Sequence, residues 1–482
     1  MITAWVTVMG FREKLRDAVR MVGFEDVYMV PGFARVEPYQ VDLSTRFSRN
    51  VSLSIPISSS PMDTVSEWEM AVALALHGGI GVIHRNMSVE EQVEAVRRVK
   101  QHPPVRLRSF YVLPDEPCSR VYEMLKSTGV RQAPLIDYTG VFRGYVRLSE
   151  LVECSKSSPA KPVAEIASSQ GRGFSIQELE EARRIIIEGV MDCVAIVSSE
   201  GRLLGTLCLE EALEEYTPVL DDNGRLRVAA AISPFDEKRA LALDDAGVDV
   251  LVSDVAHFHN RNVLSAASKL SKSVSADFIA GNIATYEAAV DTLARVEKVD
   301  GLRVGLGGGT ICSTPMVAGA YVPTLWAVAS VRDALEEYGA SDTPVIADGG
   351  IRTPADGVKA LAAGAWCLML GYALAGTDEA PAPLVRIGDR AYKPYRGMAS
   401  PGAMERRLAV DRYARTAKKV AEGVEGLVPY RGSVVRVLEE WVEALKAGLG
   451  YAGASSIREL WEKAKFGQAR RKTFEGLVLQ QP

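Results

Sequence analysis

The sequence is poor in the residues that hold metals and covalent cross-links. It contains five histidines and six cysteines in 482 residues, and no Cys-x-x-Cys pair or Cys/His cluster occurs, so neither a zinc site nor a disulfide framework is indicated. His257 and His259 lie two positions apart without a third ligand nearby, and we expect no metal there. Five cysteines are expected to be reduced, buried apolar side chains: Cys118, Cys154, Cys193, Cys208 and Cys367.

Long apolar runs and strong charge are also missing. The longest apolar stretch, 360–376, is shorter than the roughly 20 residues of a membrane span, and Gly364 and Gly371 divide it, so we predict a buried strand. The mixed N-terminus does not read as a signal peptide. A net charge of −5 argues against a general nucleic-acid or membrane-surface binder. These features predict a cytoplasmic protein.

What the sequence does contain is a series of short apolar runs that alternate with amphipathic helical segments. Continuous apolar strands of this kind are typical of a parallel sheet buried on both faces. Eight such units predict an α/β fold, a closed (β/α)8 TIM barrel with functional loops at the carboxyl ends of its strands. The predicted strands lie in 51–60, 79–84, 225–232, 248–254, 276–282, 301–307, 343–350 and 365–371.

An internal repeat interrupts the barrel between its second and third strands. Residues 133–151 align with 194–212 at an offset of 61, and each copy has a strand, a Gly-xxx-Gly turn, a second strand and an acid at a helix start (Glu150 or Glu211). Two such copies are expected to pack on each other and share a core. We predict a barrel from 1–104 and 217–482 and an inserted pair of repeats at 105–216, divided into about 105–158 and 159–216.

The loop after the sixth strand reads GLGGGTICSTP, from Gly305 to Pro315. A segment this rich in glycine loses stability inside a helix or strand. Cys312 therefore stands among backbone groups and polar residues, where a thiolate can act as a nucleophile.

The chain resembles the IMP dehydrogenase / GMP reductase family across about residues 20–462. The matching stretches, in order, are SSPMDTVSE (59–67), GGIGVIHRNMSVEEQ (78–92), GGGTICST (307–314), VIADGGIR (345–352), YRGMAS (395–400), DRY (411–413) and AEGVEGLVPYRGS (421–433). The resemblance implies a cytosolic, usually tetrameric barrel enzyme that oxidises IMP to XMP with NAD, a step of guanine nucleotide biosynthesis, and it makes the insert a pair of CBS modules.

The resemblance also assigns roles to residues. Cys312 would add to C2 of the hypoxanthine ring, and hydride would then leave for the nicotinamide. Arg412, Tyr413 and Thr314 would activate the water that hydrolyses the thioimidate. The segment 399–421, rich in Lys and Arg, would form a mobile flap.

The remaining implied contacts concern the nucleotide and the cofactor. Asp348 would bind the ribose diol, and Glu422 the ring N1–H. Phosphate, base and nucleotide contacts are expected from Ser60, Met62, Thr310, Gly350, Gly371, Tyr395, Gly397 and Met398. Contacts to NAD are expected from Asp254, Asn282, Gly305 and Gly307. Carbonyls of Gly307, Gly309 and Cys312 would bind K⁺.

The sequence departs from the family pattern in several places. The C-terminus lacks a recognisable Glu-Ser segment that contributes cation ligands to a neighbouring subunit, so we expect reduced K⁺ dependence. Tyr372, Gly308 and Pro315 replace usual residues near the site and are expected to crowd its cofactor and phosphate sides. The repeats lack the usual Thr/Ser-x-Asp signature, which leaves two interpretations: an adenine or guanine nucleotide site, or a structural module that contacts other subunits of a tetramer or octamer.

Two other functions remain open at this point. A GMP reductase would share the barrel, Cys312, Thr314 and the glutamate, but it would not need a hydrolytic Arg-Tyr pair. A non-catalytic nucleotide sensor would not need Cys312, Thr314 and Arg412 together.

Overall fold

The computed structural model describes residues 11–167, 171–213, 217–405 and 422–469. The chain forms two compact units: 1–99 with 227–482, which we call the barrel unit, and 100–226, which we call the insert unit. No described helix is long and apolar enough to cross a membrane.

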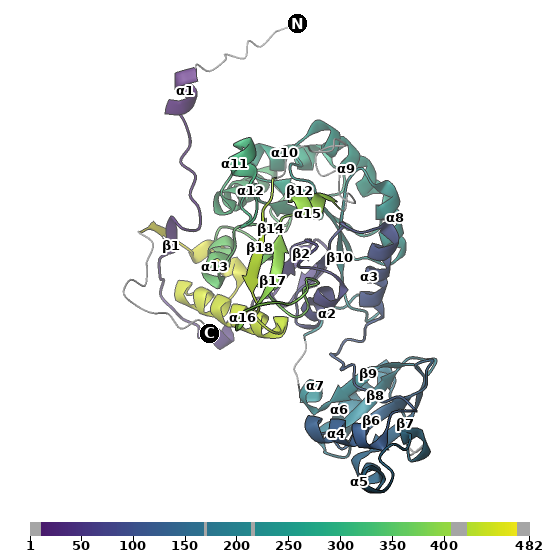
Figure 1. Ribbon diagram of the computed structural model, residues 1–482. Coiled ribbons are helices and arrows are strands. Elements are labelled where there is room, and N and C mark those ends of the chain that lie inside the picture. The colour runs from purple at the N-terminus through teal and green to yellow at the C-terminus, as the bar shows by residue number, and fades with distance from the viewer. Residues whose placement is uncertain (1–10, 168–170, 214–216, 406–421, 470–482) are drawn as a thin grey trace. The chain divides into compact units, whose positions relative to one another are not determined.

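The barrel unit is built on eight parallel strands surrounded by helices (Figure 1). The strands pair in the order β4, β15, β14, β13, β12, β11, β10, β5, and a parallel bridge between Ser58 and Ile80 joins the two ends. The predicted (β/α)8 barrel is confirmed. The strands are β4 (Ile57–Ser59), β5 (Val82–Ile83), β10 (Ala229–Ile232), β11 (Val250–Ser253), β12 (Asp277–Ile283), β13 (Gly301–Val304), β14 (Val345–Asp348) and β15 (Cys367–Leu370).

Helices follow the strands in βα units. Polar caps fix where several begin: the Asn260 side chain accepts bonds from the backbone N–H groups of residues 262 and 263, and Thr285 accepts one from residue 288. Such bonds satisfy donors that a helix start leaves unpaired. The α-helices of this unit are α1 (Phe11–Arg16), α2 (Trp68–Leu76), α3 (Val89–Gln101), α8 (Glu237–Asp245), α9 (Arg261–Ser273), α10 (Tyr286–Arg295), α11 (Thr314–Ala318), α12 (Thr324–Tyr338), α13 (Pro354–Ala362), α14 (Tyr372–Ala375), α15 (Pro401–Glu405), α16 (Val434–Ala452) and α17 (Ile457–Lys463).

The prediction for the first strand was too long. Its apolar run, 51–60, contains Pro56, which has no N–H to give to a ladder. The run divides into β3 (Val51–Leu53), which pairs with β2 (Thr45–Ser48) in an antiparallel hairpin, and β4 of the barrel. The apolar stretch 360–376 is the buried strand β15 between two helices, as predicted.

Further strands outside the barrel were not predicted. An antiparallel sheet of β16 (Val385–Ile387), β17 (Arg390–Arg396) and β18 (Glu425–Pro429) follows the last barrel strand. β1 (Val27–Met29) pairs with β19 (Phe466–Gln468) and joins distant parts of the chain.

The insert unit repeats one arrangement twice. β6 (Gln132–Ile136) with β7 (Phe142–Arg147), and β8 (Cys193–Val197) with β9 (Leu203–Cys208), are antiparallel pairs whose boundaries differ by 61 residues. Equivalent residues also meet: Gln132 Nε2 donates to the Cys193 carbonyl at 2.8 Å. The two copies therefore contact each other at equivalent positions. Their helices are α4 (Cys118–Thr128), α5 (Leu148–Ser157), α6 (Leu179–Ile187) and α7 (Leu209–Leu213).

Two expectations for the insert were wrong in part. The buried apolar residues form two clusters instead of one core, and each cluster holds residues of both predicted copies: Val163 lies in the first and Val105 in the second. Cys118 and Cys154 are not reduced thiols but form a disulfide between α4 and α5, with Cα atoms 6.0 Å apart. Packing brings the two helices together, and 36 residues of separation in sequence gave no sign of this.

Candidate active site

A cavity of about 460 Å³ opens at the carboxyl ends of the barrel strands. Polar strand ends and glycine loops meet there, as expected for this fold. Its lining includes most of the residues that the sequence predicted: Ser60, Met62, Asn282, Gly305, Gly307, Gly309, Thr310, Cys312, Thr314, Asp348, Gly350, Gly371, Tyr395, Gly397, Met398 and Glu422.

The glycine loop brings backbone close to backbone. A Cβ on Gly305, whose φ is +152°, would lie 1.9 Å from the Asp348 carbonyl oxygen, and Gly307 has a φ of +77°. Only glycine adopts these positions without strain. The loop leads to Cys312, whose N–H donates to the Gly309 carbonyl at 3.0 Å.

Cys312 begins a short line of hydrogen bonds. Its thiol donates to Thr314 Oγ1 at 3.2 Å, and the Thr314 hydroxyl donates to Glu422 Oε2 at 2.9 Å. Glu422 is 4% exposed, and its carbonyl also accepts from the backbone N–H of residue 313. A thiol proton therefore has a direct path toward a buried carboxylate. The sequence predicted the three residues but not this connection.

Arg303 lies buried between two predicted site carboxylates. Its guanidinium contacts Asp254 at 3.1 Å and Asp348 at 2.8 Å. Burial alone would lower the pKa of Arg303, but the two aspartates outweigh it and raise that pKa. Asn282 Nδ2 donates to the same Asp348 oxygen at 2.9 Å. Arg303 was missed by the sequence analysis, although a charged residue inside an apolar strand was a visible signal.

Asp254 lies outside the cavity lining. It is 1% exposed, and Arg85 contacts its other oxygen at 3.3 Å. Two buried arginines surround the carboxylate, and its expected contact with a cofactor ribose stays a prediction.

The model of the IMP dehydrogenase / GMP reductase domain matches residues 21–476. The chain belongs to this family. An inosine-5′-monophosphate dehydrogenase of Korarchaeum cryptofilum is 45% identical, covering 92% of each chain, and one of Thermoplasma acidophilum is 41% identical, covering 95% of this chain and 93% of that one. A GMP reductase structure from Trypanosoma brucei, in complex with guanosine 5′-monophosphate, is 35% identical with a TM-score of 0.74, covering 96% of this chain and 100% of that one.

One wall of the cavity is formed by Gly371, Tyr395 and Met62. A Cβ on Gly371 would lie 2.9 Å from the Tyr395 hydroxyl and 3.2 Å from the Met62 sulfur. Burial, with Asp348 nearby, raises the pKa of Tyr395 and keeps its hydroxyl protonated. Tyr372, one of the departures from the family pattern, lines the same wall with its ring 6.1 Å from that of Tyr395.

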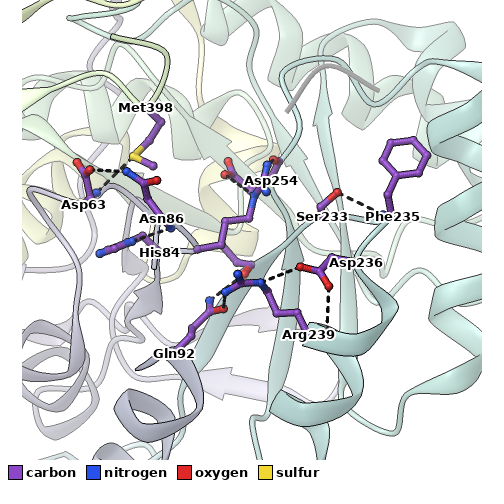
Figure 2. A network of polar contacts seen from close by, with 12 residues as sticks. Asp63, His84, Asn86, Gln92, Ser233, Phe235, Asp236, Arg239, Asp254 and Met398 are labelled. Atoms are coloured by element: carbon purple, nitrogen blue, oxygen red, sulfur yellow. Dashed lines mark hydrogen bonds and ion pairs between the residues drawn. The ribbon is translucent and has the colours of Figure 1, made fainter. Parts of the chain in front are cut away.

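A polar network supports the loops around the cavity (Figure 2). Asn86 donates to Asp63 at 2.8 Å, and the Asp63 N–H contacts the Met398 sulfur at 3.4 Å. Burial raises the pKa of Asp63, but hydrogen bonds from Arg396 and Asn86 bring it below its ordinary value. The network thus ties Met398, a predicted nucleotide contact, to the first two barrel strands.

Three further predictions concern the histidines His257 and His259, the flap residues and the carbonyls expected to bind K⁺. His257 lines the cavity while His259 bonds Asp291 at 2.7 Å, and within the described ranges no three side chains of His, Cys, Asp or Glu form a group that could hold a metal. Arg412, Tyr413 and most of the 399–421 flap lie outside the described residues. Of the three carbonyls expected to bind K⁺, that of Gly309 accepts the Cys312 N–H.

Proposed function

We propose that this chain oxidises IMP to XMP with NAD through a covalent intermediate on Cys312. The observation that most supports the covalent step is the line from Cys312 through Thr314 to Glu422 inside the barrel cavity. Loss of the thiol proton along this line leaves a thiolate, which is the reactive form of cysteine. The sulfur then adds to C2 of the purine, and hydride departs from that carbon.

The nucleotide is oriented by groups around the sulfur. Asp348, held by Arg303 and Asn282, accepts hydrogen bonds from the ribose diol. Phosphate lies against Thr310, Gly350, Gly371 and Tyr395. The base is contacted by Ser60, Met62, Gly397, Met398 and Glu422. Glu422 has a second role, because its carboxylate accepts the hydrogen bond from the Thr314 hydroxyl.

The nicotinamide of NAD would be held on the cofactor side of the cavity. Gly305, Gly307 and Ala256 line the cavity there, with Asn282 as a polar contact. NAD supplies the hydride acceptor when bound. Asp254 would act at this site through Arg303 and Arg85, as a residue that positions others.

Release of XMP requires hydrolysis. We assign water activation to Arg412 and Tyr413 with Thr314, as in the resemblance, with the 399–421 flap closing over the site. K⁺ would bind weakly at the carbonyls of Gly307, Gly309 and Cys312. Titrating KCl against the initial rate tests this: we expect little activation, and strong activation would contradict the weak site.

The insert is proposed to be a CBS pair, and the chain a cytoplasmic homotetramer. Equilibrium dialysis with ATP and GTP decides between the two roles of the pair. Binding would indicate an adenine or guanine nucleotide site, and no binding a structural module. Octamer formation on nucleotide addition would support the regulatory role.

GMP reductase is the second candidate, because solved structures similar to this chain carry that name. The dehydrogenase is favoured by the curated relatives, at up to 45% identity, and by the Arg412–Tyr413 pair. The deciding assay supplies IMP with NAD and, separately, GMP with NADPH. Formation of reduced cofactor in the first supports the dehydrogenase, and its consumption in the second the reductase. Nucleotide binding without either reaction would favour a sensor.

A further inference from the structure

Two free cysteines of the insert unit lie directly opposite each other. Cys193 on β8 and Cys208 on β9 are Cα partners in the antiparallel ladder, and both are reduced in this structure. They are 0% and 4% exposed. The Cys193 thiol donates its hydrogen bond to the Gln132 carbonyl oxygen at 3.0 Å.

The ladder places them at the kind of position where two strands bring side chains closest. Two residues along the ladder, Ala195 and Thr206 are partners. The N–H and carbonyl of Thr206 bond the backbone of Arg108, and the Ala195 carbonyl accepts from the Phe174 N–H, so Ala195 and Thr206 do not bond each other. Because pairs alternate in an antiparallel ladder, Cys193 and Cys208 also form a pair without mutual backbone bonds, for which Cα separations of about 4.5 Å are typical. That separation falls within the range that a disulfide spans, about 4.4–6.8 Å.

We propose that Cys193 and Cys208 form a dithiol site that a two-electron oxidant, such as a peroxide, converts to a cross-strand disulfide. Two S–H bonds break and one S–S bond forms. The oxidant takes both electrons and both protons, so a peroxide leaves as two waters.

The surroundings assign different roles to the two sulfurs. Cys208 is the more exposed of the two, at 4% against 0% for Cys193. The neighbouring Cys193 thiol, helped by Arg108 and opposed by burial, also lowers the pKa of Cys208. Cys208 therefore attacks the oxidant, and Cys193 then displaces the leaving group from its sulfur.

Oxidation of these cysteines would change a contact between the two repeats. Cys193 Sγ lies 3.0 Å from the Gln132 carbonyl oxygen, and Gln132 is its equivalent in the first copy. A disulfide would remove the S–H that donates across this contact, while the bond from Gln132 Nε2 to the Cys193 carbonyl stays. The equivalent pair in the first copy, Gln132 and Arg147, has no such chemistry.

The test uses the full-length protein and diamide as the oxidant. After treatment, remaining thiols are alkylated under denaturing, non-reducing conditions and the chain is digested with trypsin. Because Arg202 separates the cysteines, peptides 185–202 and 203–225 are distinct. We expect them to appear as one linked species, to lose alkylation together by at least tenfold, and to separate on addition of dithiothreitol.

Internal and matched controls make the result specific. Cys367, a buried thiol on β15, should remain alkylated. In Cys208→Ser, Cys193 should stay alkylated under the same treatment. The proposal is overturned if Cys193 and Cys208 stay as fully alkylated as Cys367, if either is linked to a different cysteine, or if Cys193 is lost equally in the Cys208→Ser variant.

Discussion

Replacing Arg303 by methionine tests the buried charge arrangement behind the site. The change keeps an apolar stem of similar length but leaves Asp348, and one side of Asp254, without a cation. Removing one partner of a buried ion pair costs about 3–5 kcal/mol. Asp254 keeps Arg85 at 3.3 Å, so we expect a value near the lower limit, about 3 kcal/mol.

Tryptophan fluorescence during urea unfolding measures this loss in the barrel unit alone. All six tryptophans lie outside residues 100–226. Arg295→Met is the matched control, because its ion pair with Asp291 is exposed (59% and 37%) and such pairs contribute about 0–1 kcal/mol. The reasoning about buried charge is refuted if the unfolding free energies of Arg303→Met and Arg295→Met differ by less than about 1 kcal/mol.

The insert unit yields two further predictions. Replacing both Cys118 and Cys154 by alanine opens a loop of 36 residues and should lower the unfolding free energy of that unit by about 4 kcal/mol. Hydrogen exchange of the β6 and β7 amides measures this loss. Unchanged protection of these amides would contradict the prediction. Burial raises the pKa of Asp221, but hydrogen bonds from the backbone N–H of Arg225 and from Lys100 outweigh it and bring the pKa to about 2, from an ordinary 3.8. This lowered pKa stabilises the fold above pH 3.8, and the stabilisation is lost as pH falls toward 2. Asp221→Asn should therefore lose less stability than the parent chain between pH 5 and pH 3 in urea titrations, and identical slopes would contradict the assignment.

Barrel and repeat were predictable because their signals are local. Apolar runs bounded by glycine or aspartate mark each barrel strand, and β11 and β15 are buried along their whole length. The offset of 61 located both strand pairs of the insert. The motif matches then placed most of the predicted site residues around one cavity.

The features that the sequence did not predict arise from contacts between residues far apart in the chain. The Cys118–Cys154 bond joins two helices whose separation carries no pattern. Asp254 resembles an exposed strand-end carboxylate, and only the approach of Arg85 and Arg303 makes it a buried one. β18 pairs with β17 across the 399–421 segment, so its partner could not be inferred from neighbouring residues.

The central claim is that the Cys312 sulfur becomes bonded to the nucleotide during turnover. Its most direct test is mass spectrometry of the chain after acid quenching in the presence of IMP and NAD. We predict a nucleotide adduct on the tryptic peptide 304–332, which contains Cys312, and neither adduct nor turnover in Cys312→Ala. Turnover that persists in Cys312→Ala, or an adduct found on another residue, would contradict the account.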